Sequence, residues 1–171
     1  MKNRSLIVYY SWIGSTEVVA KEIHRLTKFD IQKIEEKKKR ALGKIAGAAM
    51  GAFLGFKSSI KPMDFELKEY ENIFLGAQVW AGKTAPAINK YLKKASFKDK
   101  KVWLFLTKGD ENIPQQVIES ITKRIEKKGG KVVDSISITT KWDPKTNVPI
   151  APEEVRDVVH DWLKKGGVLE E

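Results

Sequence analysis

The stretch Leu6-Ile7-Val8-Tyr9-Tyr10-Ser11-Trp12-Ile13-Gly14-Ser15-Thr16 passes from an apolar run directly into a loop with three hydroxyl groups and one glycine. The run from Leu6 to Ser11 is typical of a strand buried on both faces, as in parallel sheets. Val19, Ile23 and Leu26 follow at helical spacing and predict a helix after the loop. The stretch therefore predicts a strand–loop–helix unit whose hydroxyl groups lie at the carboxyl end of the strand.

The same alternation of strand and helix continues along the chain. Apolar or alternating runs predict further strands at Phe29 to Ile34, Ile73 to Trp80, Val102 to Leu106 and Val132 to Thr140, the last of them half-exposed. Apolar stripes predict helices around Ile88, Tyr91 and Leu92, around Val117, Ile121 and Ile125, and from Val155 to Leu163. We expect Pro86, Pro114 and Pro152 in first helical turns and Gly129-Gly130 and Gly166-Gly167 after helix ends. The pattern predicts an α/β domain with a parallel sheet covered by helices on both faces.

Composition excludes several classes of protein. The chain has 171 residues, which predicts a single domain over 1–171, and no cysteine, which excludes disulfides, thiol catalysis and iron–sulfur ligation. With only two histidines we expect no metal site. The N-terminal apolar run is too short for a signal peptide and no window is long enough to span a bilayer, so we expect a cytoplasmic protein. The net charge of +10 permits acidic proteins, nucleic acid or an anionic membrane as partners.

A Gly- and Ala-rich segment at about 41–57 interrupts the alternation after the basic run Lys37 to Arg40. Its glycines recur every four residues, at Gly43, Gly47, Gly51 and Gly55. On a helix they would form one flat stripe, which we interpret as a surface helix packed closely on its neighbours. A homodimer contact and a helix lying at a membrane interface are the alternatives.

Three loops are expected at the carboxyl edge of the sheet, where ligands bind in open parallel sheets. Ser11 to Thr16 offers hydroxyls and the free amides of a helix start, which suit a phosphate, although Ser and Thr at a helix start are often only caps. Val79-Trp80-Ala81-Gly82 offers a ring on which a flat ligand could stack, or simply a core tryptophan. Thr107-Lys108-Gly109-Asp110 would by itself be a turn.

Together these loops resemble the flavodoxins and the short flavodoxin-like proteins. Tyr9 to Thr16 looks like the first strand and phosphate loop of that family, Phe74 to Ala87 like its third strand and flavin loop, and Lys101 to Gly109 like its fourth strand and loop. The inserted Gly-rich segment is also similar to one in the short members. The resemblance covers residues 5–165 and implies a doubly wound, five-stranded parallel sheet of order 2-1-3-4-5 that binds FMN.

Carried over position by position, the resemblance implies a role for each loop. The FMN phosphate would be held by Ser11, Gly14, Ser15 and Thr16, and the ribityl chain lined by Trp12 and Ile13. The isoalloxazine would be bordered by Val79, Trp80, Ala81 and Gly82, with Trp80 as the stacking ring and the Ala81–Gly82 peptide accepting a hydrogen bond from reduced N5. The pyrimidine edge would meet Thr107, Lys108, Gly109 and Asp110. No catalytic acid–base pair is implied.

The sequence departs from the family pattern at four places. Ile13 replaces the usual Thr or Ser, Ser15 the usual Asn, and Gln78 the usual Pro. The loop from Thr107 to Asp110 contains no aromatic residue. These changes predict weaker phosphate binding and stacking on one side of the flavin only.

The sequence thus predicts an FMN-binding redox protein, with an electron carrier favoured. The alternatives are a small FMN-dependent oxidoreductase acting on a quinone or a protoporphyrinogen, and a flavin-free binding module of the same fold. Basic clusters at Lys28 to Lys61 (net +6) and Lys90 to Lys101 (net +5) would raise the potential of a nearby flavin and attract an acidic redox partner. Nucleic acid is disfavoured because no aromatic residues or known motif accompany these clusters. The chain is expected to be a monomer or a homodimer.

Overall fold

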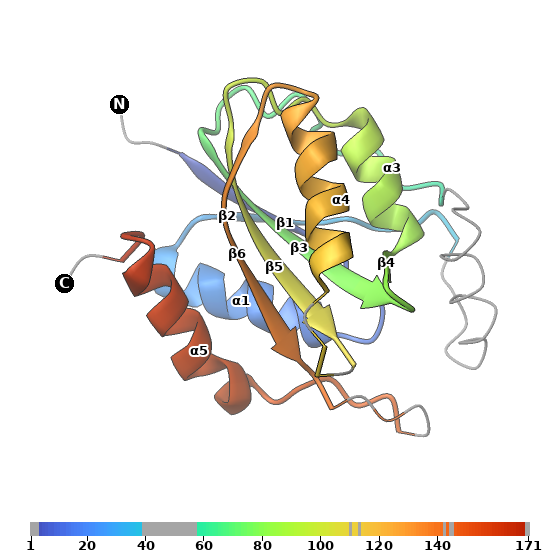
Figure 1. Ribbon diagram of the computed structural model, residues 1–171, viewed down its shortest axis with the longest axis vertical. Coiled ribbons are helices and arrows are strands. Elements are labelled where there is room, and N and C mark those ends of the chain that lie inside the picture. Colours follow the sequence, from blue (N-terminus) through green and yellow to red (C-terminus); the bar gives the residue numbers. More distant parts are fainter. Residues whose placement is uncertain are drawn as a thin grey trace.

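The computed structural model describes residues 4–38, 58–109, 111–112, 114–141, 143 and 146–169, which form a twisted sheet between two layers of helices (Figure 1). The strands are β1 (Ser5–Tyr9), β2 (Asp30–Lys33), β3 (Asn72–Trp80), β4 (Lys83–Thr84), β5 (Lys101–Lys108) and β6 (Lys131–Thr139). The helices are α1 (Ser15–Thr27), α3 (Pro86–Lys94), α4 (Gln115–Glu126) and α5 (Pro152–Lys165). Every strand and helix predicted within the described residues is therefore present within a few residues of its expected bounds.

The order of strands across the described sheet is β2-β1-β3-β5-β6, and each of these neighbours runs parallel. Counted along the chain without β4, this is the predicted order 2-1-3-4-5, which is confirmed. β4 was not predicted: it pairs antiparallel with the end of β3, and two residues are too short for any hydrophobic pattern to reveal.

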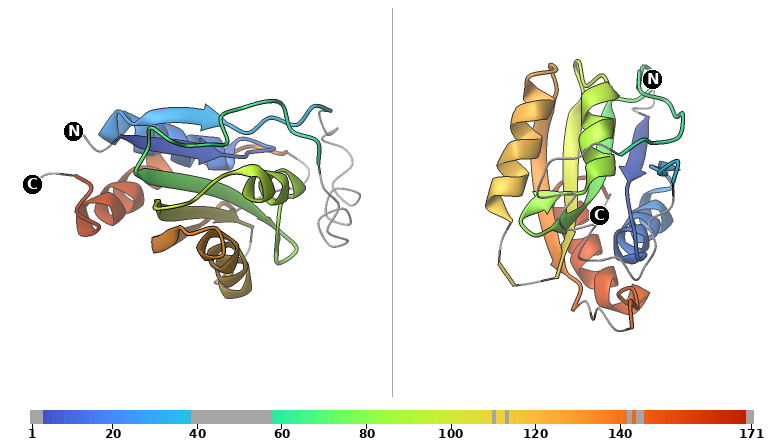
Figure 2. Two further views of the ribbon diagram at one scale, coloured as in Figure 1. Left: turned by 90° about the horizontal axis from the view of Figure 1, so that it is seen from above. Right: turned by 90° about the vertical axis from the view of Figure 1, so that its right-hand side faces the viewer.

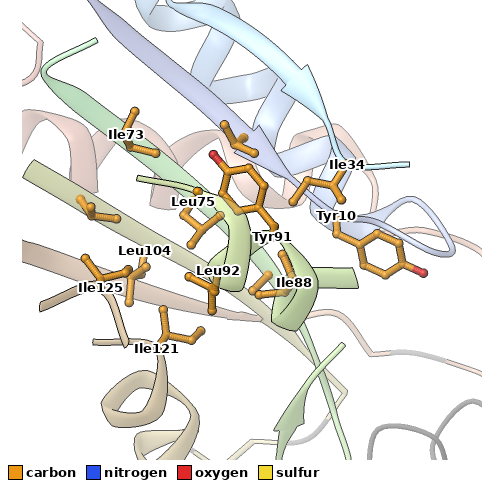
Figure 3. Packing of buried hydrophobic residues seen from close by; sticks show 14 of the residues in the cluster. Tyr10, Ile34, Ile73, Leu75, Ile88, Tyr91, Leu92, Leu104, Ile121 and Ile125 are labelled. Atoms are coloured by element: carbon orange, nitrogen blue, oxygen red, sulfur yellow. The ribbon is translucent and has the colours of Figure 1, made fainter. Parts of the chain in front are cut away.

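Figure 2 shows α3 and α4 on one face of the sheet and α1 and α5 on the other. A layer of buried hydrophobic side chains lies under each pair of helices. Side chains of β3 alternate between them: Ile73 and Leu75 pack on the first layer and Phe74 on the second. Figure 3 shows the first layer, where Leu75 and Leu104 of the sheet lie near Ile88 and Ile121 of the helices. Each such side chain stabilises the fold by about 1.5–3 kcal/mol, so the strand ends that carry the loops are firmly held.

Helix ends follow the predicted residues with one difference. Pro86 and Pro152 are the first residues of α3 and α5, whereas Pro114 is the N-cap of α4, one position before the helix. Gly166 caps the end of α5, and Gly129, with φ +79°, follows α4. None of the helices in the described ranges is long and apolar enough to cross a bilayer. The predicted segment at about 41–57, with its glycine stripe, lies outside the described residues, as does Asp110.

Candidate functional site

The three predicted loops meet at the carboxyl edge of the sheet, toward which the arrowheads of β3, β5 and β6 point in Figure 1. Thr16 Oγ1 and Thr107 Oγ1 share a buried hydrogen bond of 2.7 Å. The Trp12 amide donates to Gln78 Oε1 at 3.1 Å, and the Trp12 ring centroid lies 5.3 Å from that of Trp80. Segments far apart in the sequence are thus brought into contact at one edge.

The first turn of α1 has no side-chain cap. Its N-cap is Gly14, with φ 111° and ψ −18°, whose own N–H donates to Ser11 Oγ at 3.1 Å. The hydroxyls of Ser15 and Thr16 do not cap the helix, so the alternative that they serve only as caps is wrong. An uncapped helix N-terminus leaves amides that can bind an anion.

The hydroxyl groups of this loop are engaged by other parts of the protein. Ser15 Oγ accepts a hydrogen bond from the Ile150 amide at 3.2 Å, and Thr16 bonds to Thr107. A Cβ atom added to Gly14 would lie 3.1 Å from Pro149. The segment before α5 therefore covers the loop, a contact the sequence analysis missed because no local pattern links residues 135 positions apart.

Glu17 places a carboxylate in the first turn of α1. Burial acts to raise the pKa of Glu17, but hydrogen bonds from Lys21 and Lys33 outweigh it, so the pKa is lowered. The two ammonium groups lie 2.8 and 2.5 Å from the carboxylate oxygens. The negative charge of Glu17 is thus offset, and it does not prevent an anion from binding at the helix start.

The predicted flavin loop is a tight β-hairpin. Val79 pairs with Thr84 and Trp80 with Lys83, and the two turn residues both have left-handed backbones, with φ 47° for Ala81 and 72° for Gly82. This combination is typical of a type I′ turn. An alanine in the left-handed conformation costs about 1–2 kcal/mol of conformational free energy. The contacts of the residues on either side of the turn must therefore stabilise it by at least this amount.

A chain of hydrogen bonds pins this hairpin to both neighbouring helices. Thr84 Oγ1 donates to Asn89 Oδ1 at 2.7 Å, and Arg124 of α4 donates to the same oxygen at 2.5 Å and to the Asn89 carbonyl at 2.9 Å. Arg124 is half-buried, and burial lowers its pKa. The guanidinium thus joins α4 to α3 and, through Asn89, to β4.

Replacing Arg124 with glutamine should therefore lower the free energy of unfolding by about 1.5–3 kcal/mol, the range for hydrogen bonds to a charged donor. Urea denaturation measures this loss. Arg156→Gln is the matched control, because Arg156 is exposed and lies 3.8 Å from Glu153; its effect should stay within about 0.5 kcal/mol. Equal losses in the two variants would show that Arg124 does not pin the hairpin.

Trp80, the predicted stacking ring, lies mostly inside the protein. It is 8% exposed and belongs to the hydrophobic layer under α3 and α4. Tyr10 and Trp12 pack against it edge-on, with centroids 6.2 and 5.3 Å away. Trp12 is more exposed than Trp80, so this edge offers two candidate rings, and the assignment of Trp80 as the stacking ring stays a prediction.

A cavity of about 430 Å³ lies between the hairpin and the start of α4, lined by Val79, Gly82, Lys108, Asn112 and residues 114–117. Lys108 is 6% exposed and donates to Thr139 Oγ1 at 2.7 Å. The volume falls in the range of small-molecule sites. Residues Val79, Gly82 and Lys108, which were expected to border a flavin, therefore line one cavity; Asn112 and the start of α4 were not predicted.

The basic cluster from Lys90 to Lys101 does not surround this site. α3 runs from the carboxyl edge back to the opposite edge, where Lys101 starts β5. In the other cluster, Lys33 is paired with Glu17 and Lys61 with Glu35. Lys101 therefore lies at the opposite edge of the sheet from the site, whereas Lys90 follows Asn89, which bonds to the hairpin. The effect of this cluster on the potential of a bound flavin stays a prediction.

Comparison with solved structures shows which fold this is. The chain superimposes on a Bacteroides uniformis protein, provisionally described as a flavoprotein, with a TM-score of 0.74, 18% identity and coverage of 96% of this chain and 99% of that one. For oxidised flavodoxin 1 from Bacillus cereus the TM-score is 0.61, with 15% identity and coverage of 98% and 100%.

The fold is flavodoxin-like. A flavoprotein from Lactobacillus acidophilus, solved in complex with FMN, matches with a TM-score of 0.62 and 20% identity over 79% of this chain and 93% of that one. No family model and no curated protein matches the sequence. The likeness thus lies in the arrangement of strands and helices, while most side chains differ.

Proposed function

We propose that this flavodoxin-like protein binds FMN at the carboxyl edge of its sheet and serves as an electron carrier. The observation that carries the proposal is an uncapped N-terminus of α1 at the same edge of the sheet as a ligand-sized cavity. The two are linked by the hydrogen bond from Thr16 to Thr107, which precedes the lining residue Lys108. FMN supplies the redox chemistry when bound, and the protein supplies binding and orientation. That the flavoprotein from Lactobacillus acidophilus holds FMN in the same fold supports the choice of cofactor.

The residues present fit the phosphate of FMN. Gly14 lets the loop turn at φ 111° while Pro149 lies where a side chain would be, so the backbone amides at the start of α1 form the cradle. The Ser11, Ser15 and Thr16 hydroxyls line it and would exchange their internal hydrogen bonds for bonds to phosphate oxygens. Trp12 and Ile13 would line the ribityl chain.

The cavity wall fits a flat ring. Val79 and Gly82 would border the isoalloxazine together with Trp80 and Ala81, and the tight turn would hold the Ala81–Gly82 peptide at the ring edge. Thr107, Lys108 and Gly109 would meet the pyrimidine side, with Asp110 next in sequence. The buried ammonium of Lys108 is suited to donate a hydrogen bond to a carbonyl oxygen there and to exclude water.

Titration calorimetry with FMN, riboflavin and FAD tests the proposal. We expect the tightest binding for FMN, because riboflavin lacks the phosphate and FAD needs room for a second nucleotide. Thr16→Ala should weaken FMN binding by about 1–3 kcal/mol while leaving riboflavin binding almost unchanged. Thr27→Ala, at the other end of α1, where its hydroxyl bonds to the Ile23 carbonyl at 2.8 Å, is the control. Equal affinity for FMN and riboflavin would exclude the phosphate cradle.

A flavin-free binding module is the second candidate. It is favoured by the internal bonds of Ser15 and Thr16 and by the burial of Trp80. Absence of heat and of tryptophan quenching at high micromolar FMN would establish this alternative over the carrier.

An FMN-dependent oxidoreductase acting on a quinone or protoporphyrinogen is less well supported than a carrier. Lys108 is the one titratable side chain in the described lining of the cavity, and an acid–base pair is absent from that lining. Turnover of a quinone by the FMN-loaded protein well above that of free FMN would favour the enzyme. An acidic redox partner, attracted by the basic clusters, stays a proposal.

A further inference from the structure

The edge of the sheet opposite the candidate site joins two basic segments that are separate in the sequence. The Asp99 amide donates to the Gly129 carbonyl at 3.0 Å, and the Lys131 amide to the Lys100 carbonyl at 2.8 Å. Lys128 Nζ bonds to the carbonyls of Lys93 and Ala95 at 2.6 and 2.8 Å. Figure 1 shows the ends of α3 and α4 side by side at the top, beside the starts of β5 and β6.

We call this surface the basic end and define it by residues Lys90 to Lys101 and Lys123 to Lys131. The first segment has six basic residues and one acidic residue, and the second has five and one. The basic end therefore has a net charge of +9, almost the whole +10 of the chain. Neither segment alone reveals this concentration, because only the tertiary structure brings them together.

The charges of the basic end are not neutralised by ion pairs. In the described parts of the chain, none of its eleven cations forms a salt bridge. Burial and the positive charge of Arg124 both lower the pKa of Lys128, so like charges repel one another here. The acidic groups within or beside it are Asp99, Glu126, Glu71 next to Lys101, and Asp64 and Glu66 on either side of Phe65, over whose ring Lys94 lies.

Helix dipoles explain only part of this arrangement. Lys93, Lys94 and Lys123 lie in last helical turns, where cations are favourable. Four other lysines lie in loops or at strand starts, where no helix dipole stabilises a positive charge: Lys98, Lys100, Lys101 and Lys131. Repulsion between like charges lowers the stability of the fold, and no salt bridge within the described residues offsets it here. Such a surface indicates a binding partner of opposite charge.

That partner does not need to reach the candidate site. Along α4 the rise from Val117, in the cavity lining, to Lys127 of the basic end is about 15 Å, roughly twice the screening length of about 8 Å at physiological salt. Arg124 lies nearer the cavity, bonded to Asn89. The cations beyond the ends of α3 and α4, from Lys98 to Lys101 and from Lys127 to Lys131, are therefore largely screened from a ligand at the carboxyl edge. A surface bound here leaves that edge facing the solvent.

We propose that the basic end docks the protein on an anionic lipid bilayer. Ten of its eleven cations are lysines, flexible point charges that suit diffuse attraction to headgroups, whereas phosphate recognition in nucleic acids favours arginine. The two aromatic residues within its segments, Tyr91 and Phe97, are fully buried, so neither of these rings is available to stack on bases.

Sedimentation of the full chain with vesicles tests this proposal, using phosphatidylcholine with 30% phosphatidylserine and phosphatidylcholine alone. We expect binding only to the anionic vesicles, weakening with salt. Near an anionic surface each lysine is worth about fivefold in affinity, so the triple variant Lys93→Gln, Lys98→Gln, Lys127→Gln should bind about 100-fold more weakly. All three side chains are exposed, and circular dichroism checks that the fold is retained.

The control variant makes the same change of charge elsewhere: Lys37→Gln, Lys38→Gln, Lys141→Gln, three exposed lysines beyond the ends of β2 and β6. It should bind anionic vesicles within about threefold of the parent. An equal or larger loss in the control, or no binding of the parent, would overturn the proposal. Binding to duplex DNA that depends on Lys93, Lys98 and Lys127, without vesicle binding, would assign the basic end to nucleic acid instead.

Discussion

Replacing Trp80 with alanine should lower the free energy of unfolding by about 3–5 kcal/mol, the range for truncating a large buried aromatic, and should also weaken FMN binding. The ring is 8% exposed and packs edge-on against Tyr10 and Trp12, so its removal leaves a cavity under the proposed phosphate and flavin loops. Urea denaturation and FMN titration, performed on the same preparation, measure the two effects.

Trp162→Ala separates stability from binding. Trp162 is equally buried, at 7% exposure, but lies in the opposite layer, where it packs against Phe74 and Trp103 and donates to Asp134 Oδ2 at 2.9 Å. It should cost similar stability and leave FMN affinity unchanged under conditions where both variants are folded. If the two variants lose affinity equally, the assignment of Trp80 to the flavin site is wrong.

Gly76→Ala should destabilise the protein by about 3 kcal/mol, at the upper end of the range for overpacked cores. Gly76 lies in the sheet between Tyr9 of β1 and Phe105 of β5. A Cβ atom there would approach the Phe105 ring to 2.3 Å and the Tyr9 Cβ to 2.8 Å. Neither neighbour can move freely, because both are buried in the layer under α1 and α5. Thermal or urea unfolding measures the loss.

A second substitution identifies the cause. Phe105→Leu removes the ring atoms that clash, so the double variant Gly76→Ala, Phe105→Leu should be more stable than the sum of the two single effects predicts, by about 1–3 kcal/mol. Gly82→Ala is the comparison glycine: nothing lies within 4 Å of the added carbon, and only its φ of +72° is unfavourable, so about 1 kcal/mol is expected. Strict additivity in the double variant would rule out the clash with Phe105.

Local patterns in the sequence were sufficient to predict the five parallel strands and the four described helices, but not β4. The run from Leu6 to Tyr10 and the stripe of Val117, Ile121 and Ile125 each belong to a single strand or helix. Each pattern can be recognised locally, because a strand or helix that is buried on one or both faces needs apolar residues at the spacing of those faces. The positions of the three loops follow in turn, because parallel strands that alternate with helices place the loops after β1 and β5 and the hairpin after β3 at one edge.

Contacts between distant residues were decided only by the tertiary structure. The hairpin at Ala81 and Gly82 depends on Asn89 and Arg124, and the cover over Gly14 on Pro149 and Ile150; none of these pairings leaves a periodic signal. Lys90 to Lys101 was identified as a basic cluster in the sequence, but Lys123 to Lys131 was not, and neither was the meeting of the two segments at one end of the sheet. The positions of charged residues in the sequence do not say on which surface of the protein they lie. The packing of α3 and α4 on the sheet determines that these ammonium groups lie close together.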